Sequence, residues 1–520
     1  MSEFEITRDI TLAGQSASEF IGGEGQFQSS IALDPDMPKD DTSNRPSGLL
    51  RPVGMAKFSG TAITGAPLWM IPNPKNTDMY VYTYDGKVHV VNSSLAMGTA
   101  LNGGAAMTNA SGNGGEYYDN KIILPKEADV AVYQIWNTTL VQNYWTGTLG
   151  LTALSNTTYP SINGVEIPNH MAYRHTDNKC YFCDVADNRG ILSYIKTKKT
   201  TAEGDTDDSS VYNALDFPYG WYPTCITSFG KYLLIALIEG ISTAVKQKPA
   251  KLALWNTYGS SFEDVTPDNF ADPLITAVKN VNGTVYVFSG SAAGGCSVWR
   301  FLSVNMLDAV AYLPDAYPPF QGAVDHLMTR TVFGTKTEVP SEIGVVYALG
   351  SIYPSLAQST GLHGIIRAND DGAANPHVTA LKYFQQNASK PQPITGWKTD
   401  TPTYGLDKLS TTYQTSILVD EVQRIGRKFT ITRVQIPFIQ AIAANMVLTV
   451  KIYFDGGSSN TTIATINNTN YSDSERNIVI RHDIDIEGRN DFYLQLEWSG
   501  SALLTVEVPI TISVKILEDT

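Results

Sequence analysis

The sequence predicts an all-β fold, a β-propeller of about six blades followed by a C-terminal β-sandwich or jelly roll. Three observations lead to this prediction. A hairpin pattern recurs along most of the chain, and after residue 412 it gives way to short strands in which apolar and polar residues alternate. No segment has the 3.6-residue apolar period of an amphipathic helix.

Composition agrees with strands and turns. Charged residues make up only 17% of the 520 residues, against roughly 25% in ordinary soluble domains, and Ser, Thr, Asn, Gly and Tyr take their place. Tyr and Thr suit a half-buried strand, while Asn and Gly suit turns. The length allows two to four domains, because single cores usually stop growing at about 250 to 300 residues.

We divide the chain into an extended N-terminal arm (1–60), a propeller (61–395), a linker (396–412) and a sandwich (413–520). The arm contains "IALDPDMPKDDTSNRPSGLLRP", whose prolines and turn-forming residues oppose regular strand pairing. It is expected to lie either along a neighbouring subunit or over its own domain.

The propeller prediction depends on a repeat of strand, short polar turn, second strand and long loop. Equivalent positions recur every 52 to 61 residues, at Ile123, Tyr181, Leu233, Tyr286 and Tyr347. This spacing suits four-stranded blades with enlarged loops. Asp85-Gly86 and Asn282-Gly283 are dipeptides typical of two-residue hairpin turns.

The C-terminal region has seven or eight strands in about 110 residues, such as "FTITRVQIPF" (429–438) and "FYLQLEW" (492–498). Alternation of apolar and polar residues is typical of strands with one face in a core. Many short strands joined by tight turns favour a sandwich.

One stretch, "NHMAYRHTDNKCYFCDV", contains possible zinc ligands at His170, His175, Cys180 and Cys183. Two cysteines three positions apart on a strand point to opposite faces. We therefore expect buried blade residues and no metal here.

The acidic loop "DTDDSSVYNALD" (205–216) resembles a calcium loop through Asp205, Asp207 and Asp216. Ser210 stands where such a loop needs glycine, and no helices are predicted on either side. The prediction is a solvated loop, and no cofactor is expected for the chain.

The sequence has no recognisable catalytic motif, and we expect no enzymatic activity. Asp184, Asp187 and Asp325 are carboxylates that could converge on a propeller channel, although their spacing does not establish it.

The segment "FPYGWYP" (217–223) carries four aromatic residues, Phe217, Tyr219, Trp221 and Tyr222. Such residues dominate binding hot spots and stack on sugars, but they also fill gaps between blades. The sequence leaves both interpretations open.

Charge and hydropathy indicate which classes of partner are not expected. The formal charge of −14 opposes specific nucleic-acid binding. The apolar run "YLLIALI" (232–238) is far short of the roughly 20 residues needed to cross a bilayer, so no membrane insertion is expected. With no visible signal segment and only four cysteines, the chain is expected to fold in a reducing cytoplasm.

The order of three motifs resembles a propeller-bearing structural protein of tailed bacteriophages, of the tail nozzle or tail-tip type. They are "LDPDMPKDDTSNRPSGLLRPVG", "YDNKIILPKEADVAVY" and "IPNHMAYRHTDNKCYFCDV". The resemblance continues through "NALDFPYGWYPTCITSFGKYLLIAL", "KLALWNTYGSSFEDV" and "ITAVKNVNGTVYVFSG". The resemblance covers about residues 25 to 305 and consists of hairpin patterns. It implies a virion subunit without catalytic residues, assembled in the host cytoplasm.

The predicted function is therefore a non-enzymatic structural component of a phage tail, a homo-oligomer around the tail axis. Its partners would be copies of itself and neighbouring tail proteins. Two alternatives are a virion adhesin that binds a host surface glycan, and a propeller glycoside hydrolase.

Overall fold

The structure is a computed structural model of the 520-residue chain. It describes residues 3–8, 27–31, 33, 49–50, 53–58, 60, 62–75, 77–92, 94–107, 114–126, 130–135, 138–141, 161–162, 165–166, 172–196, 209–240, 248–327, 330–338, 342–350, 362–368, 375–384, 391–401, 403–410, 416–420, 422–438, 442–455, 460–471, 477–481, 487–500, 504, 506–507 and 510–517. The chain divides into two compact units. The first comprises Met1–Ala56, Val345–Asn369 and Leu409–Thr520, and the second comprises Lys57–Gly344 and Asp370–Lys408.

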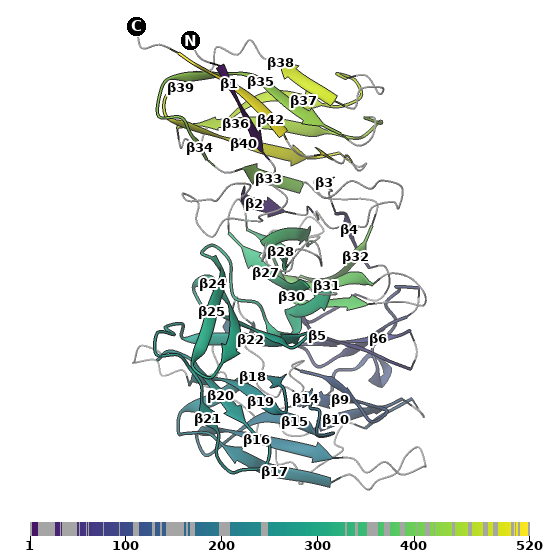
Figure 1. Cartoon of the computed structure of the whole chain (residues 1–520). Helices are drawn as coiled ribbons and strands as arrows, with labels where there is room; N and C mark the ends of the chain where they lie inside the picture. Colours follow the sequence, from purple (N-terminus) through teal and green to yellow (C-terminus); the bar gives the residue numbers. More distant parts are fainter. Residues whose placement is uncertain are drawn as a thin grey trace. The chain divides into compact units, whose positions relative to one another are not determined.

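Seven antiparallel sheets follow one another in chain order, and contacts between each sheet and the next, and between the last and the first, close them into a ring. Figure 1 labels many of their strands. The first three are β5(Pro67–Pro72)-β6(Met79–Thr83)-β7(Val88–Val91); β8(Glu116–Tyr118)-β9(Lys121–Pro125)-β10(Val130–Gln134)-β11(Thr139–Val141); and β14(Ala172–Arg174)-β15(Cys180–Ala186)-β16(Arg189–Lys196)-β17(Ser209–Asp216). The next two are β18(Trp221–Phe229)-β19(Tyr232–Glu239)-β20(Lys251–Trp255)-β21(Glu263–Asp264) and β22(Leu274–Val281)-β23(Thr284–Ser291)-β24(Gly294–Ser303)-β25(Met306–Leu313). The last two are β26(Val324–Leu327)-β27(Arg330–Thr337)-β28(Ile343–Leu349)-β29(Leu362–Arg367) and β30(Pro376–Phe384)-β31(Gln392–Thr399)-β32(Tyr404–Leu409)-β4(Met55–Lys57).

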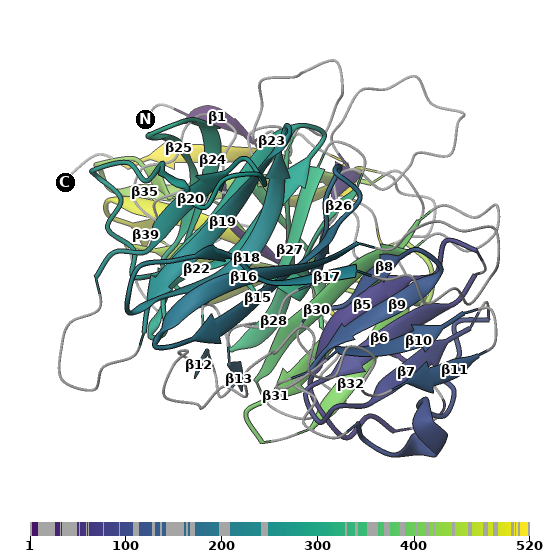
Figure 2. The same ribbon diagram turned by 90° about the horizontal axis from the view of Figure 1, so that it is seen from below.

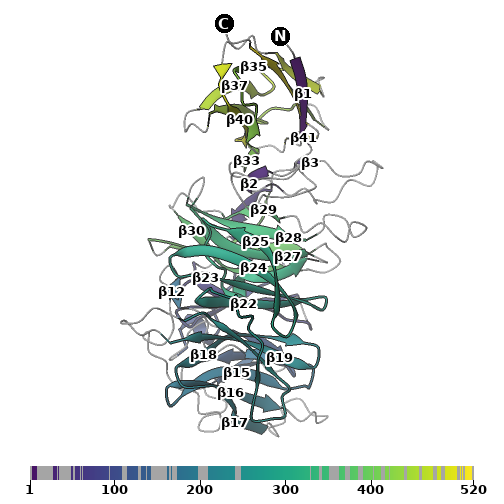
Figure 3. The same cartoon turned by 60° about the vertical axis from the view of Figure 1, so that its left-hand side comes forward.

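This arrangement confirms the all-β propeller, with seven sheets among the described residues where about six were predicted. Consecutive strands of a sheet pair with one another, as β15, β16 and β17 do (Figure 3), and only Asp187 and Asn188 separate β15 from β16. Asn282 and Gly283 have φ of 51° and 90°, which fits the predicted hairpin turn between β22 and β23. Figure 2 shows β5 and β6 from below.

The last of the seven sheets joins the first. In β30, the Thr379 Oγ1 hydroxyl donates to the carbonyl of Pro67 in β5 at 2.6 Å. The fourth strand of this sheet, β4, comes from the beginning of the chain. A strand from one terminus thus completes a sheet made by residues more than 300 positions later, and this closes the ring.

The predicted linker at 396–412 is corrected by this sheet, since β31 and β32 occupy most of it. Two glycines of this segment allow close packing. A Cβ at Gly405 would lie against the ring of Trp397, and a Cβ at Gly396 would lie 2.7 Å from Pro67 Cβ. Both positions therefore need glycine because neighbouring side chains occupy the space.

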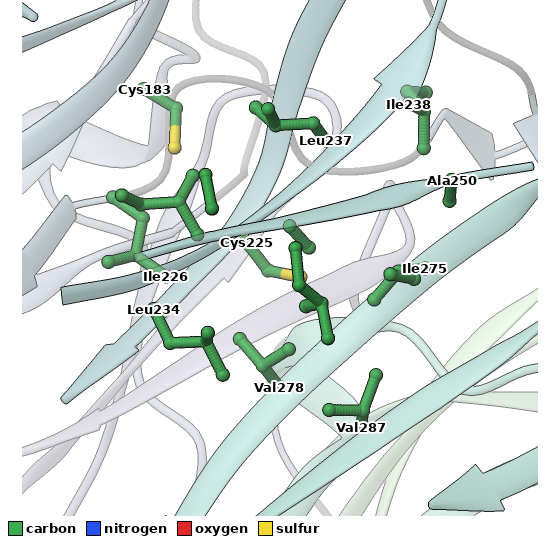
Figure 4. Packing of buried hydrophobic residues seen from close by; sticks show 14 of the residues in the cluster. Cys183, Cys225, Ile226, Leu234, Leu237, Ile238, Ala250, Ile275, Val278 and Val287 are labelled. Carbon is green, nitrogen blue, oxygen red and sulfur yellow. The ribbon is translucent and has the colours of Figure 1, made fainter. Parts of the chain in front are cut away.

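The ring is held by apolar side chains between neighbouring sheets. Strand β18 is buried on both faces along most of its length, and β19 likewise. Figure 4 shows the packing around Cys225 and Leu234, with Ile275 and Val278 of β22 close by. Continuous apolar runs such as "YLLIALIE" therefore form strands covered on two sides.

The unit that comprises Met1–Ala56, Val345–Asn369 and Leu409–Thr520 includes β29 and most of β28, and it also contains two larger sheets. One has the order β1(Glu3–Arg8)-β42(Ile510–Ile516)-β35(Phe429–Pro437)-β38(Asn477–Arg481), with β39(Glu487–Gly488) pairing β35. The other has the order β2(Phe27–Ile31)-β33(Ser416–Asp420)-β40(Asp491–Trp498)-β36(Leu448–Phe454)-β37(Asn460–Ile466), with β34(Gln423–Arg424) pairing β40. This unit also has the two-stranded pair β3(Leu49–Leu50)-β41(Val506–Glu507). The pair β12(Ser161–Ile162)-β13(Val165–Glu166) and the short 3₁₀ helices η1(Asn102–Gly104) and η2(Gln321–Ala323) belong to the unit that comprises Lys57–Gly344 and Asp370–Lys408.

The two larger sheets share one buried apolar cluster. It includes Ile431 and Ile512 of one sheet and Val450 and Leu494 of the other. Strand β40 alternates partly buried and buried residues throughout, as its sequence pattern predicted. The description of this region as a sandwich or jelly roll stays a prediction.

The predicted N-terminal arm (1–60) also needs correction. Its described residues form β1, β2, β3 and β4, and these pair with strands of the same chain. Strand β1 pairs with β42 over six residues, from Glu3 opposite Lys515 to Arg8 opposite Ile510. The sequence did not predict these strands, because each is short and lies between segments rich in prolines and turn-forming residues.

Candidate functional site

The candidate site is a cavity of about 300 Å³ at the centre of the ring. The first strand of every sheet contributes to its wall, namely β5, β8, β14, β18, β22, β26 and β30. The site therefore exists only when all seven sheets are assembled.

Polar side chains connect neighbouring sheets around this cavity. The amide of Ser228 donates to Tyr173 Oη at 2.9 Å, and Asn280 Nδ2 donates to the Ser228 carbonyl at 2.8 Å. Gln321 makes two bonds to Val278, donating to its carbonyl at 2.8 Å and accepting from its amide at 2.7 Å. These bonds satisfy polar groups that the ring buries.

A charged cluster lies on one side of the cavity. Lys382 Nζ of β30 donates to Asp325 Oδ1 of β26 at 2.9 Å, and Lys279 Nζ of β22 lies 3.6 Å from the same oxygen. The Tyr383 amide donates to Asp325 Oδ2 at 2.8 Å, and His326 Nδ1 lies 3.4 Å from Oδ1. Three consecutive sheets are joined at one carboxylate.

The environment shifts the pKa values of these groups. Burial by itself would raise the pKa of Asp325, but Lys382, His326 and Lys279 hold it well below its usual range. Burial, together with the neighbouring Lys382, lowers the pKa of Lys279. Burial raises the pKa of Glu116, which also lines the cavity. Asp325 is thus an ionised counter-charge for the two lysines.

The three carboxylates named from the sequence, Asp184, Asp187 and Asp325, lie in different surroundings. Asp325 lies beside the cavity, whereas Asp184 is buried within β15 and Asp187 lies in the turn after it, with φ of 49°. Only 2% of the Asp325 side chain is exposed. A hydrolase needs two carboxylates that reach the substrate, and the sealed position of Asp325 does not supply one.

Sequence reasoning did not find Lys279, Lys382 or Glu116. A signal was present for the lysines, since Lys279 follows the apolar run "ITAV" and Lys382 lies between Leu381 and Tyr383, and both runs become the first strand of a sheet. A side chain at such a position faces either a neighbouring sheet or the channel. A charged side chain is expected in the channel, because burying a charge between apolar sheets is costly. Glu116, which follows two glycines, gave no such signal.

The possible zinc ligands that the structure describes, His175, Cys180 and Cys183, do not form a metal-binding group. The ring nitrogens of His175 lie 3.2 Å from Ser228 Oγ and 3.1 Å from the Lys231 carbonyl. Cys180 and Cys183 pack in different apolar clusters, on opposite faces of β15, as their spacing predicted. No group of three possible metal ligands occurs among the described residues.

Other predicted positions fall partly outside the description. His170, Asp205 and Asp207 lie outside the described residues. Asp216, at the end of β17, forms an ion pair with Arg189 at 3.5 Å.

The aromatic loop at 217–223 is mostly core. Phe217, Trp221 and Tyr222 are 1%, 9% and 7% exposed, and only Tyr219, at 71%, faces solvent. Of the two interpretations left open by the sequence, the burial of Phe217, Trp221 and Tyr222 in one apolar cluster favours gap-filling residues, while Tyr219 stays exposed. Lys251 Nζ lies 5.0 Å from the centre of the Trp221 ring.

Two solved structures have a chain path similar in part to this one. The chain is similar to a streptogramin B lyase structure at 10% identity and a TM-score of 0.43, covering 70% of this chain and 98% of that one. It is also similar to the Cps50 (Swd1) β-propeller domain of Myceliophteria thermophila, at 8% identity and a TM-score of 0.43, covering 68% and 99%. These likenesses concern the fold alone.

No family model and no curated protein matches the chain. Among the described residues, no helix is both long and apolar enough to span a membrane.

Proposed function

We propose that this protein is a non-enzymatic structural subunit of a bacteriophage tail, present in several copies around the tail axis. Its partners are copies of itself and neighbouring tail proteins, and it assembles in the host cytoplasm. The resemblance of its hairpin motifs to tail nozzle and tail-tip proteins is the basis for the tail assignment.

One observation carries the structural role: both ends of the chain are paired. Strand β1 near the N-terminus and β42 near the C-terminus form adjacent strands, and β4 completes the last sheet of the ring. In an antiparallel pair each strand is held by several backbone hydrogen bonds. Neither end can be pulled away without breaking such a ladder, which suits a subunit that bears load.

The charges around the cavity agree with a structural role. Asp325 joins β22, β26 and β30 through Lys279 and Lys382. Because a buried carboxylate that loses its partners is strongly destabilising, this cluster holds the three sheets in register. A rigid ring of this kind can keep its diameter within a larger assembly.

The test is to locate the protein in phage particles. Antibodies raised against the purified chain should label one end of the tail in negative-stain images. Antibodies pre-adsorbed with the same protein serve as the control and should give no label. Labelling of the capsid, or particles free of label and of this chain by mass spectrometry, would contradict the proposal.

A second measurement addresses assembly. Light scattering after size exclusion should detect a defined oligomer, either for the chain alone or when mixed with a tail extract. A chain that stays monomeric at all concentrations and never enters a tail complex would count against the homo-oligomer.

A further inference from the structure

The cations of the central cavity are more accessible than the buried acid that pairs with them. The side chains of Lys279 and Lys382 are 25% and 23% exposed, whereas that of Asp325 is 2% exposed. His326 is half exposed at the same wall. The acid therefore lies behind the lysines, and the lysines face the cavity.

The two ammonium groups retain unused hydrogen-bonding capacity. Both approach the same oxygen, Asp325 Oδ1, at 2.9 Å for Lys382 and 3.6 Å for Lys279. An ammonium group has three N–H donors, so one carboxylate oxygen cannot satisfy two of them. The remaining donors face the cavity, where Glu116 also lies near both lysines. Burial raises the pKa of Glu116, which weakens its competition with a bound anion.

Other groups on the wall set the size and charge of that ligand. Glu116 is an acid there, and its Oε1 accepts from the Tyr117 amide at 2.9 Å. Asn280 and Gln321 are neutral and already bonded to backbone. A volume of about 300 Å³ is at the small end of ligand sites, which excludes polymers and favours a compact ligand.

We propose that the central cavity binds a small oxyanion, either a phosphate or a short dicarboxylate, bridged between Lys279 and Lys382. Two oxygens of one anion accept from the two ammonium groups, and His326 lies at the same wall to donate a further bond. Such charge-assisted bonds are stronger than bonds between neutral groups. The site joins β22 and β30 across β26 and so binds across three sheets.

Titration calorimetry of the full chain in low-salt buffer tests this proposal. Separate titrations use inorganic phosphate and succinate, with sodium chloride at matched ionic strength as the reference. Saturable binding of phosphate alone identifies a phosphate site, and binding of succinate alone identifies a carboxylate site. Absence of saturable binding by either anion would overturn the proposal.

Lys279→Met is the decisive variant, because it leaves the 2.9 Å bond between Lys382 and Asp325 in place. It should weaken binding about tenfold or more, given the worth of one charge-assisted bond, and Lys279→Arg should restore much of the affinity.

Lys451→Met is the matched control. Lys451 has a similar exposure of 22% and pairs with Glu497 at 2.6 Å, but it belongs to the other unit. It should bind the anion as the wild type does. Equal binding by Lys279→Met and the wild type would show that the anion binds elsewhere and would overturn the proposal.

Discussion

His377 in β30 is a histidine held in an environment that disfavours its charged form. It is fully buried, and neither ring nitrogen has a hydrogen-bond partner among the described residues. The rings of Phe320 and Tyr317 lie 5.1 and 6.0 Å away, centre to centre. Burial, with the nearby charges of Lys336 and Lys398, lowers its pKa to about 3.

The expected consequence is a loss of stability in mild acid. Between pH 6.5 and 3 the unfolded chain binds a proton at His377 and the folded chain does not, so stability present above pH 6.5 is lost as the pH falls. Through His377 alone, the free energy of unfolding should be about 2 kcal/mol lower at pH 5 than at pH 7. Urea unfolding at pH 7 and pH 5 measures it.

His377→Phe removes this titration and preserves an aromatic ring beside Phe320. The difference in unfolding free energy between pH 7 and pH 5 should shrink by that amount relative to the wild type. An unchanged difference would mean that His377 is already protonated in the folded state. Asp325 does not confound the comparison, because its lowered pKa acts below pH 4.

Close approach of elements explains several glycines, as between η2 and β5. A Cβ at Gly322 would overlap the carbonyl oxygen of Leu68 and lie 2.9 Å from Trp69 Cε3. The backbone of η2 therefore lies directly on β5, the first strand of the first sheet. This contact joins the segment that leads into the sixth sheet to the first sheet.

Gly322→Ala should destabilise the protein by about 1–3 kcal/mol, the usual cost of adding a methyl group to a packed interior. Gly259→Ala is the control, since its nearest neighbours are 3.6 to 3.8 Å away. Both are compared by their midpoints in urea. If the two variants unfold at the same midpoint, η2 and β5 do not pack as described.

Ring closure is a property of the whole molecule, and it depends on the N-terminal strands. Strand β4 occupies the edge of the last sheet, where Met55 is 4% exposed. Phe58, next to it, is 7% exposed, and its amide donates to the Leu406 carbonyl at 2.8 Å. In contrast, Phe4 of β1 is 37% exposed.

Graded truncation separates these contributions. Removing residues 1–50 deletes β1, β2 and β3, which all pair with strands outside the ring, and gives the reference melting temperature. Removing residues 1–58 also deletes Met55 and Phe58, and burial of each contributes roughly 1.5–3 kcal/mol, so a clearly larger drop is expected. Equal melting temperatures for the two truncations, by circular dichroism, would show that β4 does not close the ring.

Local patterns in the sequence determined much of the propeller. Ile123, Tyr181, Leu233 and Tyr286 all lie in the second strand of their sheets, as the repeat predicted. Tyr347 does not, because it lies in β28, the third strand of its sheet. The repeat loses its register there since β26 and β27 are short or polar and resemble loop sequence.

By itself the sequence determined the hairpins, because a strand, its turn and the next strand depend on neighbours within about 15 residues. Tertiary structure alone decided which strand closes the ring and which side chains meet in the channel. Lys279, Asp325 and Lys382 span 103 residues and show no shared pattern. They meet because the curvature of seven packed sheets, summed around the ring, brings their first strands to one axis.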